Sequence, residues 1–132
     1  MQIRTITDQP SAEGPAEYFT GRVRLENAFS FPEPGRTNAA LVIFEPGART
    51  AWHTHPYGQL LYVVSGEGWV RSEGGAKRAI RAGDTVFFEP GERHWHGATA
   101  TRAMSHVAVQ ERKDGSPVDW LEQVSNVDYL AD

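Results

Sequence analysis

Apolar and polar residues alternate along most of this chain, in short runs separated by turn-forming residues. Within residues 21–29, Val23 and Leu25 alternate with charged neighbours, which predicts a half-buried strand. Residues 38–45 form a nearly continuous apolar run, which predicts a strand buried on both faces or lying at a subunit contact. Further strands are predicted at residues 51–55, 59–65, 69–72, 77–80, 85–89, 93–97 and 101–110. Roughly nine short strands divided by glycine and proline turns favour a sandwich or a closed barrel.

The two ends of the chain depart from this alternation. Residues 1–20 contain turn formers and little periodicity, so we predict an N-terminal arm that precedes a barrel over about residues 21–112. Ser116 and Pro117 resemble the start of a helix, and apolar residues follow at helical spacing. We therefore predict a helical tail over about residues 116–130. No linker or repeat divides the chain, which is expected to be one domain of 132 residues.

Composition excludes several classes of protein. The formal charge of −4 argues against a nucleic-acid partner, because phosphate binding requires a basic face. No apolar run approaches the roughly 20 residues that a membrane span requires, and no secretory signal is visible. We therefore predict a cytoplasmic protein without a membrane partner. The sequence contains no cysteine, which excludes disulfides, thiolate metal sites and thiol catalysis.

All five histidines lie between residues 53 and 106, where they form two His-x-His pairs and one single histidine. On a strand, side chains two residues apart point the same way, so His53 and His55 share one face and His94 and His96 another. Imidazoles from neighbouring strands can meet on one ion at distances of about 2 Å. A single His-x-His pair is also common at surfaces, but two pairs together predict a metal site. Imidazole and amide oxygen suit Mn, Fe, Co, Ni or Zn.

The spacing of these pairs resembles the two motifs of the cupin family. The first motif places glycine at 47 and 66 and histidine at 53 and 55, with Gln59 where glutamate is usual. The second begins at Gly83 and contains Gly91 and His94, although Glu89 and Ala98 replace the common proline and asparagine. The resemblance implies an all-β, single-domain jelly-roll barrel that holds one divalent transition metal. The implied metal ligands are His53, His55, Gln59 and His94.

A narrower likeness extends over almost the whole chain, to small bacterial cupins that act as manganese-dependent hydroxynitrile lyases. It is carried by the stretches FEPGARTAWHTHPYGQ, PGERHWHGA, TRAMSHVAVQER and PVDWLEQV. This resemblance implies reversible cleavage of an (R)-cyanohydrin to an aldehyde and hydrogen cyanide, with manganese as the metal. It also implies that four further residues surround the metal pocket, namely Thr50, His96, His106 and Gln110.

The residue at position 59 has a chemical meaning of its own. Three neutral imidazoles and a neutral amide would leave the ion's double positive charge uncompensated, which favours Lewis-acid chemistry over cycling between Fe(II) and Fe(III). We expect His106 to be the general base and His96 to orient it or share its proton. For Thr50 and Gln110, a packing role competes with a functional one. Gln59 itself has the alternative of being a weak ligand or a hydrogen-bond partner in a degenerate site.

Apolar residues of the strands should form a dry interior that suits a small, uncharged substrate. The candidates are Val42, Phe44, Leu61, Val63, Met104 and Ala108. Core packing is also the expectation for the tryptophans at 52, 69, 95 and 120. We expect a homodimer or homotetramer, formed through the apolar strand 39–44 and the N-terminal arm.

Two other functions remain open at this point. A cupin of another activity, such as an iron-dependent dioxygenase or an isomerase, would use the same ligands, and single-turnover oxygen uptake would separate an oxygenase from a lyase. A non-enzymatic cupin that binds a small molecule is the other alternative.

Overall fold

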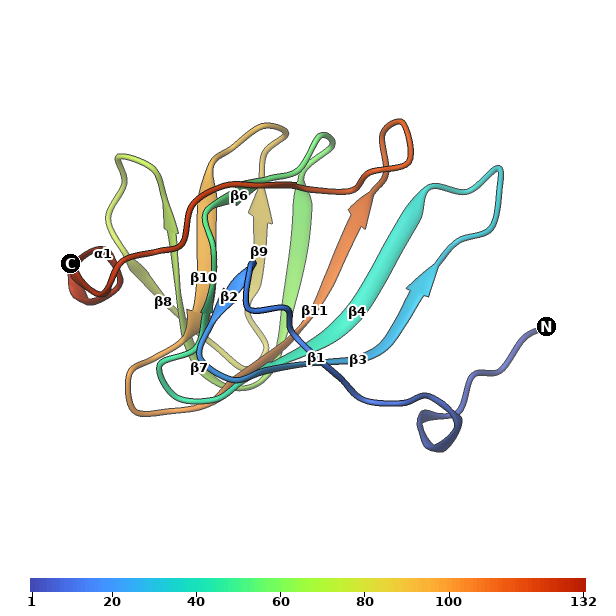
Figure 1. Ribbon diagram of the computed structural model, residues 1–132, viewed down its shortest axis with the longest axis horizontal. Coiled ribbons are helices and arrows are strands. Elements are labelled where there is room, and N and C mark those ends of the chain that lie inside the picture. Colours follow the sequence, from blue (N-terminus) through green and yellow to red (C-terminus); the bar gives the residue numbers. More distant parts are fainter.

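Antiparallel strands build the fold, and over residues 59–64 of the longest strand every second side chain is buried. The computed structural model describes residues 1–132 and shows a curled sheet around a closed interior, with one short α-helix at its side (Figure 1). A 3₁₀ turn, η1, spans Ile6–Asp8. The strands are β1 (Ala12–Glu13), β2 (Phe19–Thr20), β3 (Val23–Ser30), β4 (Thr37–Phe44), β5 (Arg49–Thr50), β6 (His53–Thr54), β7 (Gln59–Ser72), β8 (Arg78–Arg81), β9 (Thr85–Phe88), β10 (His94–Ala98), β11 (Met104–Glu111) and β12 (Asp119–Trp120), and the helix is α1 (Asn126–Leu130).

Strand order explains how residues distant in sequence meet. Neighbouring strands follow the order β1-β3-β4-β11-β7-β10-β5-β2, and every pairing is antiparallel. Strand β6 adds to β10, which brings His53 opposite His94. The predicted all-β, single-domain jelly roll is therefore confirmed, and the two histidine motifs lie side by side inside it. No helix is long and apolar enough to cross a membrane.

Strand β7 corrects one prediction. The sequence indicated two strands with a turn at residues 66–68, but β7 runs without a break from Gln59 to Ser72. Its first part pairs with β9 and its second part with β8 and β10. Gly66 bends it, with φ at +75°, and a Cβ there would lie 1.9 Å from the carbonyl oxygen of Ala103. Only glycine permits this approach, so the residue that suggested a turn produces a bend.

The hydrophobic core confirms the predicted interior. All six candidate residues belong to one cluster of 13 buried side chains between the two faces of the curled sheet. For strand 38–45 the sequence allowed burial on both faces or a position at a subunit contact. Most of β4 is half-buried in the single chain, so burial on both faces within the chain is wrong and the subunit contact stays a prediction. Trp52 and Trp95 point away from the barrel interior into a second cluster with Val124 and Tyr129.

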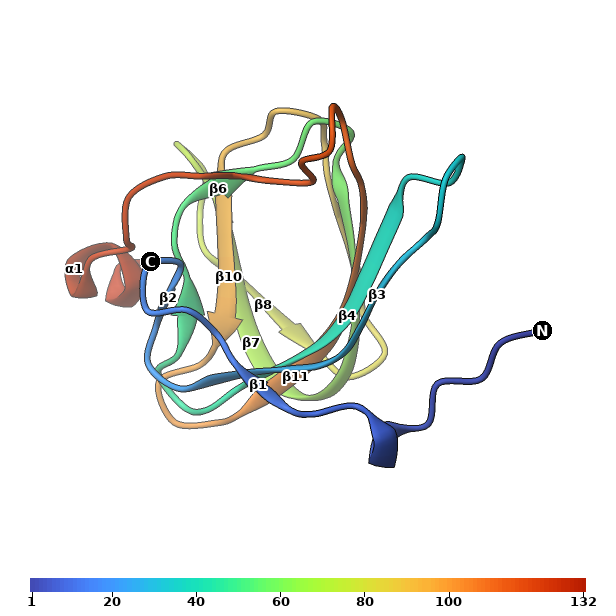
Figure 2. The same cartoon turned by 45° about the vertical axis from the view of Figure 1, so that its right-hand side comes forward.

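The N-terminal arm is more ordered than the sequence suggested. Strand β1 pairs with β3, and β2 pairs with β5, so residues 12–20 extend the sheet instead of lying outside it. Phe19 is buried in the main core. Residues before β1 project from the barrel, and the two termini lie at opposite ends of the molecule (Figures 1 and 2).

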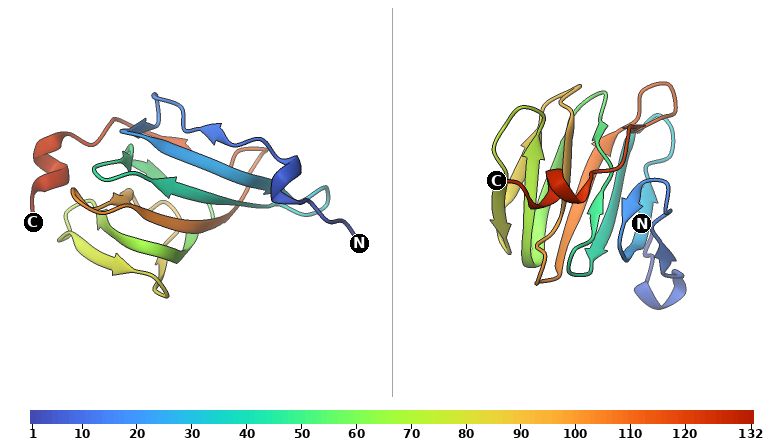
Figure 3. Two further views of the ribbon diagram at one scale, coloured as in Figure 1. Left: turned by 90° about the horizontal axis from the view of Figure 1, so that it is seen from below. Right: turned by 60° about the vertical axis from the view of Figure 1, so that its left-hand side comes forward.

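The helix predicted over residues 116–130 is wrong for most of that range. Asp119 and Trp120 form β12, which pairs with β6, so their backbone groups are used in a ladder and not in a helix. The helix begins at Asn126 and is capped by Ser125, whose Oγ accepts a hydrogen bond from the backbone nitrogen of Asp128. This is the same Ser-x-x-Asp signature that Ser116 carries, but the residues that follow Ser125 have no strand partner. The segment between β11 and α1 crosses one end of the barrel beside β6 (Figures 1 and 3).

Candidate metal centre

Five histidines converge at one end of the barrel interior, and all five are buried. The ring centroid of His53 lies 4.3 Å from that of His94, 5.0 Å from that of His55 and 5.3 Å from that of His96. His106 reaches the group through His96, at 4.7 Å between centroids. A buried cluster of polar rings is costly to desolvate, so it requires a ligand or mutual hydrogen bonds.

Backbone carbonyls fix the tautomer of three of these rings. The Nδ1 atoms of His53, His55 and His94 lie 2.9, 2.8 and 2.8 Å from the carbonyl oxygens of Ala51, Pro117 and Glu92 respectively. A carbonyl oxygen only accepts, so each Nδ1 carries the proton. Each Nε2 is then a free lone pair, which is the arrangement that metal-binding histidines show. The Nε2 of His55 is buried and has no hydrogen-bond partner.

The orientation of Gln59 also favours a cation. Its side-chain nitrogen donates to Oε1 of Gln110 at 3.0 Å, and the nitrogen of Gln110 donates to the carbonyl oxygen of Asn38 at 3.4 Å. Oε1 of Gln59 is thereby turned toward Nε2 of His94, 3.3 Å away. Two lone pairs facing each other repel unless a cation lies between them. The residues present therefore fit a divalent metal ion, and the four predicted ligands lie together.

A second set of three nitrogens overlaps the first. Ring nitrogens of His53, His94 and His96 all lie within 4.8 Å of one another, so these three histidines could hold one metal ion. His53 and His94 belong to both sets. His55 and Gln59 complete the predicted set, whereas His96 alone completes the second. Unlike the other rings, His96 has no carbonyl that fixes its tautomer, because its Nδ1 faces His106.

Burial keeps the whole cluster neutral. It lowers the pKa of His94 and of His106 to about 3, and it lowers that of His53, His55 and His96 as well. Neighbouring imidazoles add to this effect at His53 and His96, since a second positive charge would repel the first. The cluster therefore presents lone pairs without charge at neutral pH, and a bound divalent ion would keep its full charge.

His96 and His106 form a pair of their own. Nε2 of His106 lies 3.0 Å from Nδ1 of His96, and one proton must lie between them. Each neutral ring carries one proton, and one of these two protons lies between the rings. The two nitrogens that face away from the contact therefore share the other proton, so that one is a donor and the other an acceptor. Those outer atoms, Nε2 of His96 and Nδ1 of His106, are buried and have no partner. The pair can accept one proton and donate another at the same time.

An apolar pocket of about 290 Å³ opens onto the cluster. Seven of the eight predicted site residues line it, and His94 lies behind them against Gln59. Thr50 accepts a hydrogen bond from the backbone nitrogen of His96, so it supports that histidine's strand. Gln110 orients Gln59. The apolar lining residues are Pro15, Tyr18, Phe19, Leu25, Ala40, Val42, Ala108, Pro117, Val118 and Trp120.

The family of the chain follows from its sequence together with this architecture. The Cupin domain family matches residues 40–109, slightly more than half of the chain. The chain is a cupin. Over 129 residues this cupin is 54% identical to a protein of Granulicella tundricola named (R)-mandelonitrile lyase, and the match covers 98% of each chain.

Solved structures show the same architecture. A cupin-like protein from Thermotoga maritima has a TM-score of 0.83 and 35% identity to this cupin, over 89% of this chain and 90% of that one. A predicted oxalate decarboxylase from the same organism has a TM-score of 0.72 and 20% identity, over 91% and 100% of the two chains. The second likeness shows the shared fold alone.

Sequence reasoning missed three aromatic residues of the cupin's pocket. The helix predicted at Trp120 is wrong, because this residue belongs to β12, whereas its predicted core packing is confirmed. Its ring also packs against His53, at 4.8 Å between centroids. Tyr18 stacks on Trp120 at 4.7 Å, and Phe19 meets it edge-on at 5.7 Å. The sequence did carry one signal for a strand at Trp120. Val118 and Trp120 are apolar residues two positions apart, a spacing that fits a strand as well as a helix.

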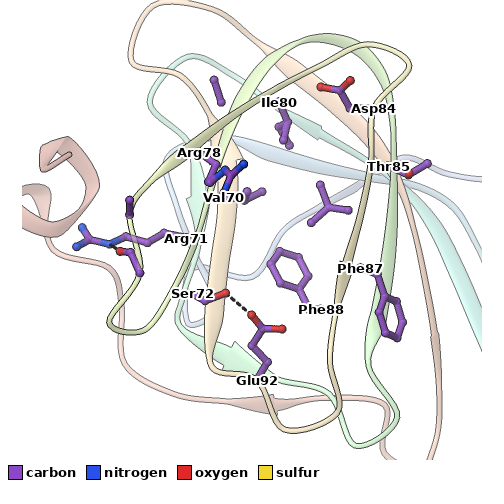
Figure 4. A pocket seen from close by; sticks show the side chains of 14 residues that line it. Val70, Arg71, Ser72, Arg78, Ile80, Asp84, Thr85, Phe87, Phe88 and Glu92 are labelled. Atoms are coloured by element: carbon purple, nitrogen blue, oxygen red, sulfur yellow. Dashed lines mark hydrogen bonds between the residues drawn. The ribbon is translucent and has the colours of Figure 1, made fainter.

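A larger cavity of about 540 Å³ lies on the other side of Phe88, between β8 and β9 (Figure 4). Phe88 separates it from the histidines, stacking on His94 at 3.6 Å between centroids. At its rim Ser72 donates a hydrogen bond to Glu92 (Figure 4). No histidine lines this cavity.

Proposed function

We propose that this cupin is a metal-dependent hydroxynitrile lyase that cleaves and forms (R)-cyanohydrins. One observation carries the proposal: the lone pairs of three neutral histidines and Gln59 converge at the closed end of an apolar pocket. The relative from Granulicella tundricola, 54% identical over nearly the whole chain and named (R)-mandelonitrile lyase, supports the same reaction. The metal is proposed to be manganese, bound by His53, His55, Gln59 and His94.

The metal centre and the His96–His106 pair have separate roles in the proposed reaction. A divalent ion at this centre supplies Lewis-acid polarisation of the substrate's oxygen. The His96–His106 pair takes up the hydroxyl proton of the cyanohydrin, with His106 as the base and His96 sharing the proton. Because burial lowers the pKa of His106 to about 3, the pair holds this proton only transiently. The bond between the carbinol carbon and the nitrile carbon then breaks, and its electron pair leaves with cyanide. The pair returns the proton to cyanide, which departs as hydrogen cyanide beside the aldehyde.

The direct test is synthesis from benzaldehyde and cyanide by the manganese-loaded protein. We expect an excess of (R)-mandelonitrile over the (S)-enantiomer, measured by chiral chromatography at a pH where the uncatalysed reaction is slow. Racemic product formed at the rate of a protein-free control would rule the proposal out.

Changing Gln59→Glu tests the neutral ligand shell. A carboxylate would cancel part of the ion's charge, so we expect tighter metal binding together with a turnover number about 10-fold lower. Metal affinity by calorimetry and mandelonitrile cleavage would be measured on the same preparation. Faster cleavage by this variant would contradict a Lewis-acid role that depends on the uncompensated charge.

Changing His106→Ala tests the proposed base. The side chain contacts His96 and not the ligand nitrogens, so metal content should stay the same while cleavage slows about 100-fold or more. Val107→Ala is the matched control, because the neighbouring side chain is less buried and lies on the opposite face of β11. Full turnover in His106→Ala, with normal metal content, would remove His106 from the mechanism.

The proposed assembly is a homodimer or homotetramer formed through the outer face of the sheet. Leu60 in β7 lies between Phe87 and Val109, and this apolar row continues to Ala39 in β4. Tyr62 stands beside the row and is 52% exposed. A contiguous apolar surface over four strands exceeds the scattered apolar side chains of ordinary monomer surfaces.

Changing Tyr62→Arg should dissociate this assembly, because a charge would be buried at the contact. We expect light scattering to give a mass near that of the 14.6 kDa chain for the variant, and a multiple of it for the unmodified protein. The substitution lies outside the pocket, so cyanohydrin cleavage per metal ion should remain. A monomeric unmodified protein would contradict the proposed assembly.

A further inference from the structure

The two terminal segments of the chain form the outer wall of the pocket. Tyr18 and Phe19 come from the N-terminal arm, and Trp120 comes from β12 near the C-terminus. The stack of Tyr18 on Trp120 is nearly parallel, with 14° between the rings. All three residues lie outside residues 40–109, which match the cupin family, whereas every proposed metal ligand lies within that range. The metal centre and the wall therefore come from separate parts of the chain.

The wall stands directly beside the metal centre. Trp120 pairs with His53 in the ladder between β12 and β6, and its ring packs on the imidazole. Pro117, from the same segment, accepts the Nδ1 hydrogen bond of His55. A molecule whose oxygen lies near the Nε2 atoms of these histidines has this wall beside its carbon group. The other sides of the pocket are lined by small or aliphatic side chains, including Leu25 and Val42.

The exposed side chain of Gln123 joins the two terminal segments by hydrogen bonds. The side-chain nitrogen of Gln123 donates to the carbonyl oxygens of Ala16 and Glu17, at 2.9 and 2.8 Å. Its oxygen accepts from Oγ1 of Thr20 at 3.1 Å. These three bonds join the chain's beginning to its end across about 100 residues of sequence, and they hold Tyr18 in place between them.

We infer that Tyr18 and Trp120 determine which carbon group the substrate carries, and that Gln123 is the residue that positions them. The inference rests on the proposed function. An apolar pocket bounded by aromatic rings favours a single flat aryl group, which gains edge and face contacts that an alkyl chain lacks. The stacked rings of Tyr18 and Trp120 form the outer boundary of the pocket and so limit the length of the substrate's carbon group. A fused or extended aryl group would collide with the ring of Tyr18.

The experiment compares three cyanohydrins, derived from acetaldehyde, benzaldehyde and 2-naphthaldehyde, in four variants of the full-length, manganese-loaded protein. Tyr18→Ala should raise kcat/KM for the naphthyl substrate about 10-fold relative to the phenyl one. Trp120→Phe should lower the preference for phenyl over methyl. Gln123→Ala should raise KM for mandelonitrile several-fold and leave kcat unchanged. Leu121→Ala, whose side chain is exposed beside the wall, should change none of these ratios.

A binding measurement separates this inference from the proposed function. Calorimetry with benzyl alcohol, which cannot be cleaved, should show weaker binding to Gln123→Ala than to the unmodified protein or Leu121→Ala. If no form of the protein cleaves cyanohydrins but this binding pattern is found, the role of Tyr18, Trp120 and Gln123 in binding is supported and the lyase proposal fails. If Gln123→Ala binds benzyl alcohol normally and Tyr18→Ala keeps the substrate ratios of the unmodified protein, the inference is overturned. Tyr18→Leu replaces Tyr18→Ala should the smaller side chain prevent folding.

Discussion

The variant His55→Ala is expected to lose its metal and its cyanohydrin cleavage, whereas His96→Ala keeps the metal. His55 has its proton held on Nδ1 by the carbonyl oxygen of Pro117, so its Nε2 lone pair is free for an ion. His96 uses Nδ1 to contact His106. Loss of a residue that only hydrogen-bonds to a ligand weakens metal binding by up to roughly 100-fold. Loss of the ligand itself, as in His55→Ala, should weaken it by more. Cleavage should fall in both variants, but only His55→Ala should regain activity with added metal.

The measurement is metal content by plasma emission, followed by a titration of Mn²⁺ into stripped protein. Both histidines are buried, so circular dichroism of each variant provides the control for folding. Retained metal in His55→Ala and lost metal in His96→Ala would replace the proposed ligand set with the alternative one of His53, His94 and His96.

The metal-free protein is expected to lose stability steeply as the pH falls below about 6.5. Burial lowers the pKa of His94 and His106 to about 3 in the folded state, against an ordinary value of 6.5. Below pH 6.5 the unfolded chain therefore binds protons that the folded chain does not, which favours unfolding. Each such histidine costs about 1.4 kcal/mol per pH unit, so the two together cost about 5 kcal/mol between pH 6.5 and 4.5. That is comparable with the whole stability of a small domain.

Urea unfolding of chelator-treated protein at several pH values measures this dependence. The slope of the unfolding free energy against pH should be positive between pH 4.5 and 6.5. His106→Asn removes one of the titrating rings, so its slope should be lower by about 1.4 kcal/mol per pH unit. A stability independent of pH across this range would show that the histidines are protonated or exposed in the folded protein, contrary to their burial.

Much of the fold could be predicted because alternation and turn residues act locally. Val23 and Leu25 alternate with charged neighbours at the start of β3, and the structure buries Val23, half-buries Leu25 and exposes Arg24, as that pattern predicts. The predicted ligands His53, His55, Gln59 and His94 also lie together, because the spacing of the two motifs matches antiparallel strands that the jelly roll brings side by side.

The remaining errors share a physical cause, which is that a local signal has more than one tertiary outcome. The Ser116 signature permits a helix, but pairing of β12 with β6 offers the same backbone groups better partners. Gly66 permits a turn or a bend, and the close carbonyl of Ala103 selects the bend. Trp120 carries no local sign that it faces His53, because that contact joins residues 67 positions apart in sequence.

The most direct test of the central claim is mandelonitrile cleavage by the purified protein before and after removal of its metal, with metal content measured at each stage. Activity should disappear with the metal and return, in proportion to occupancy, when Mn²⁺ is restored. Full occupancy of the centre without cleavage, or cleavage that persists in metal-free protein, would contradict it.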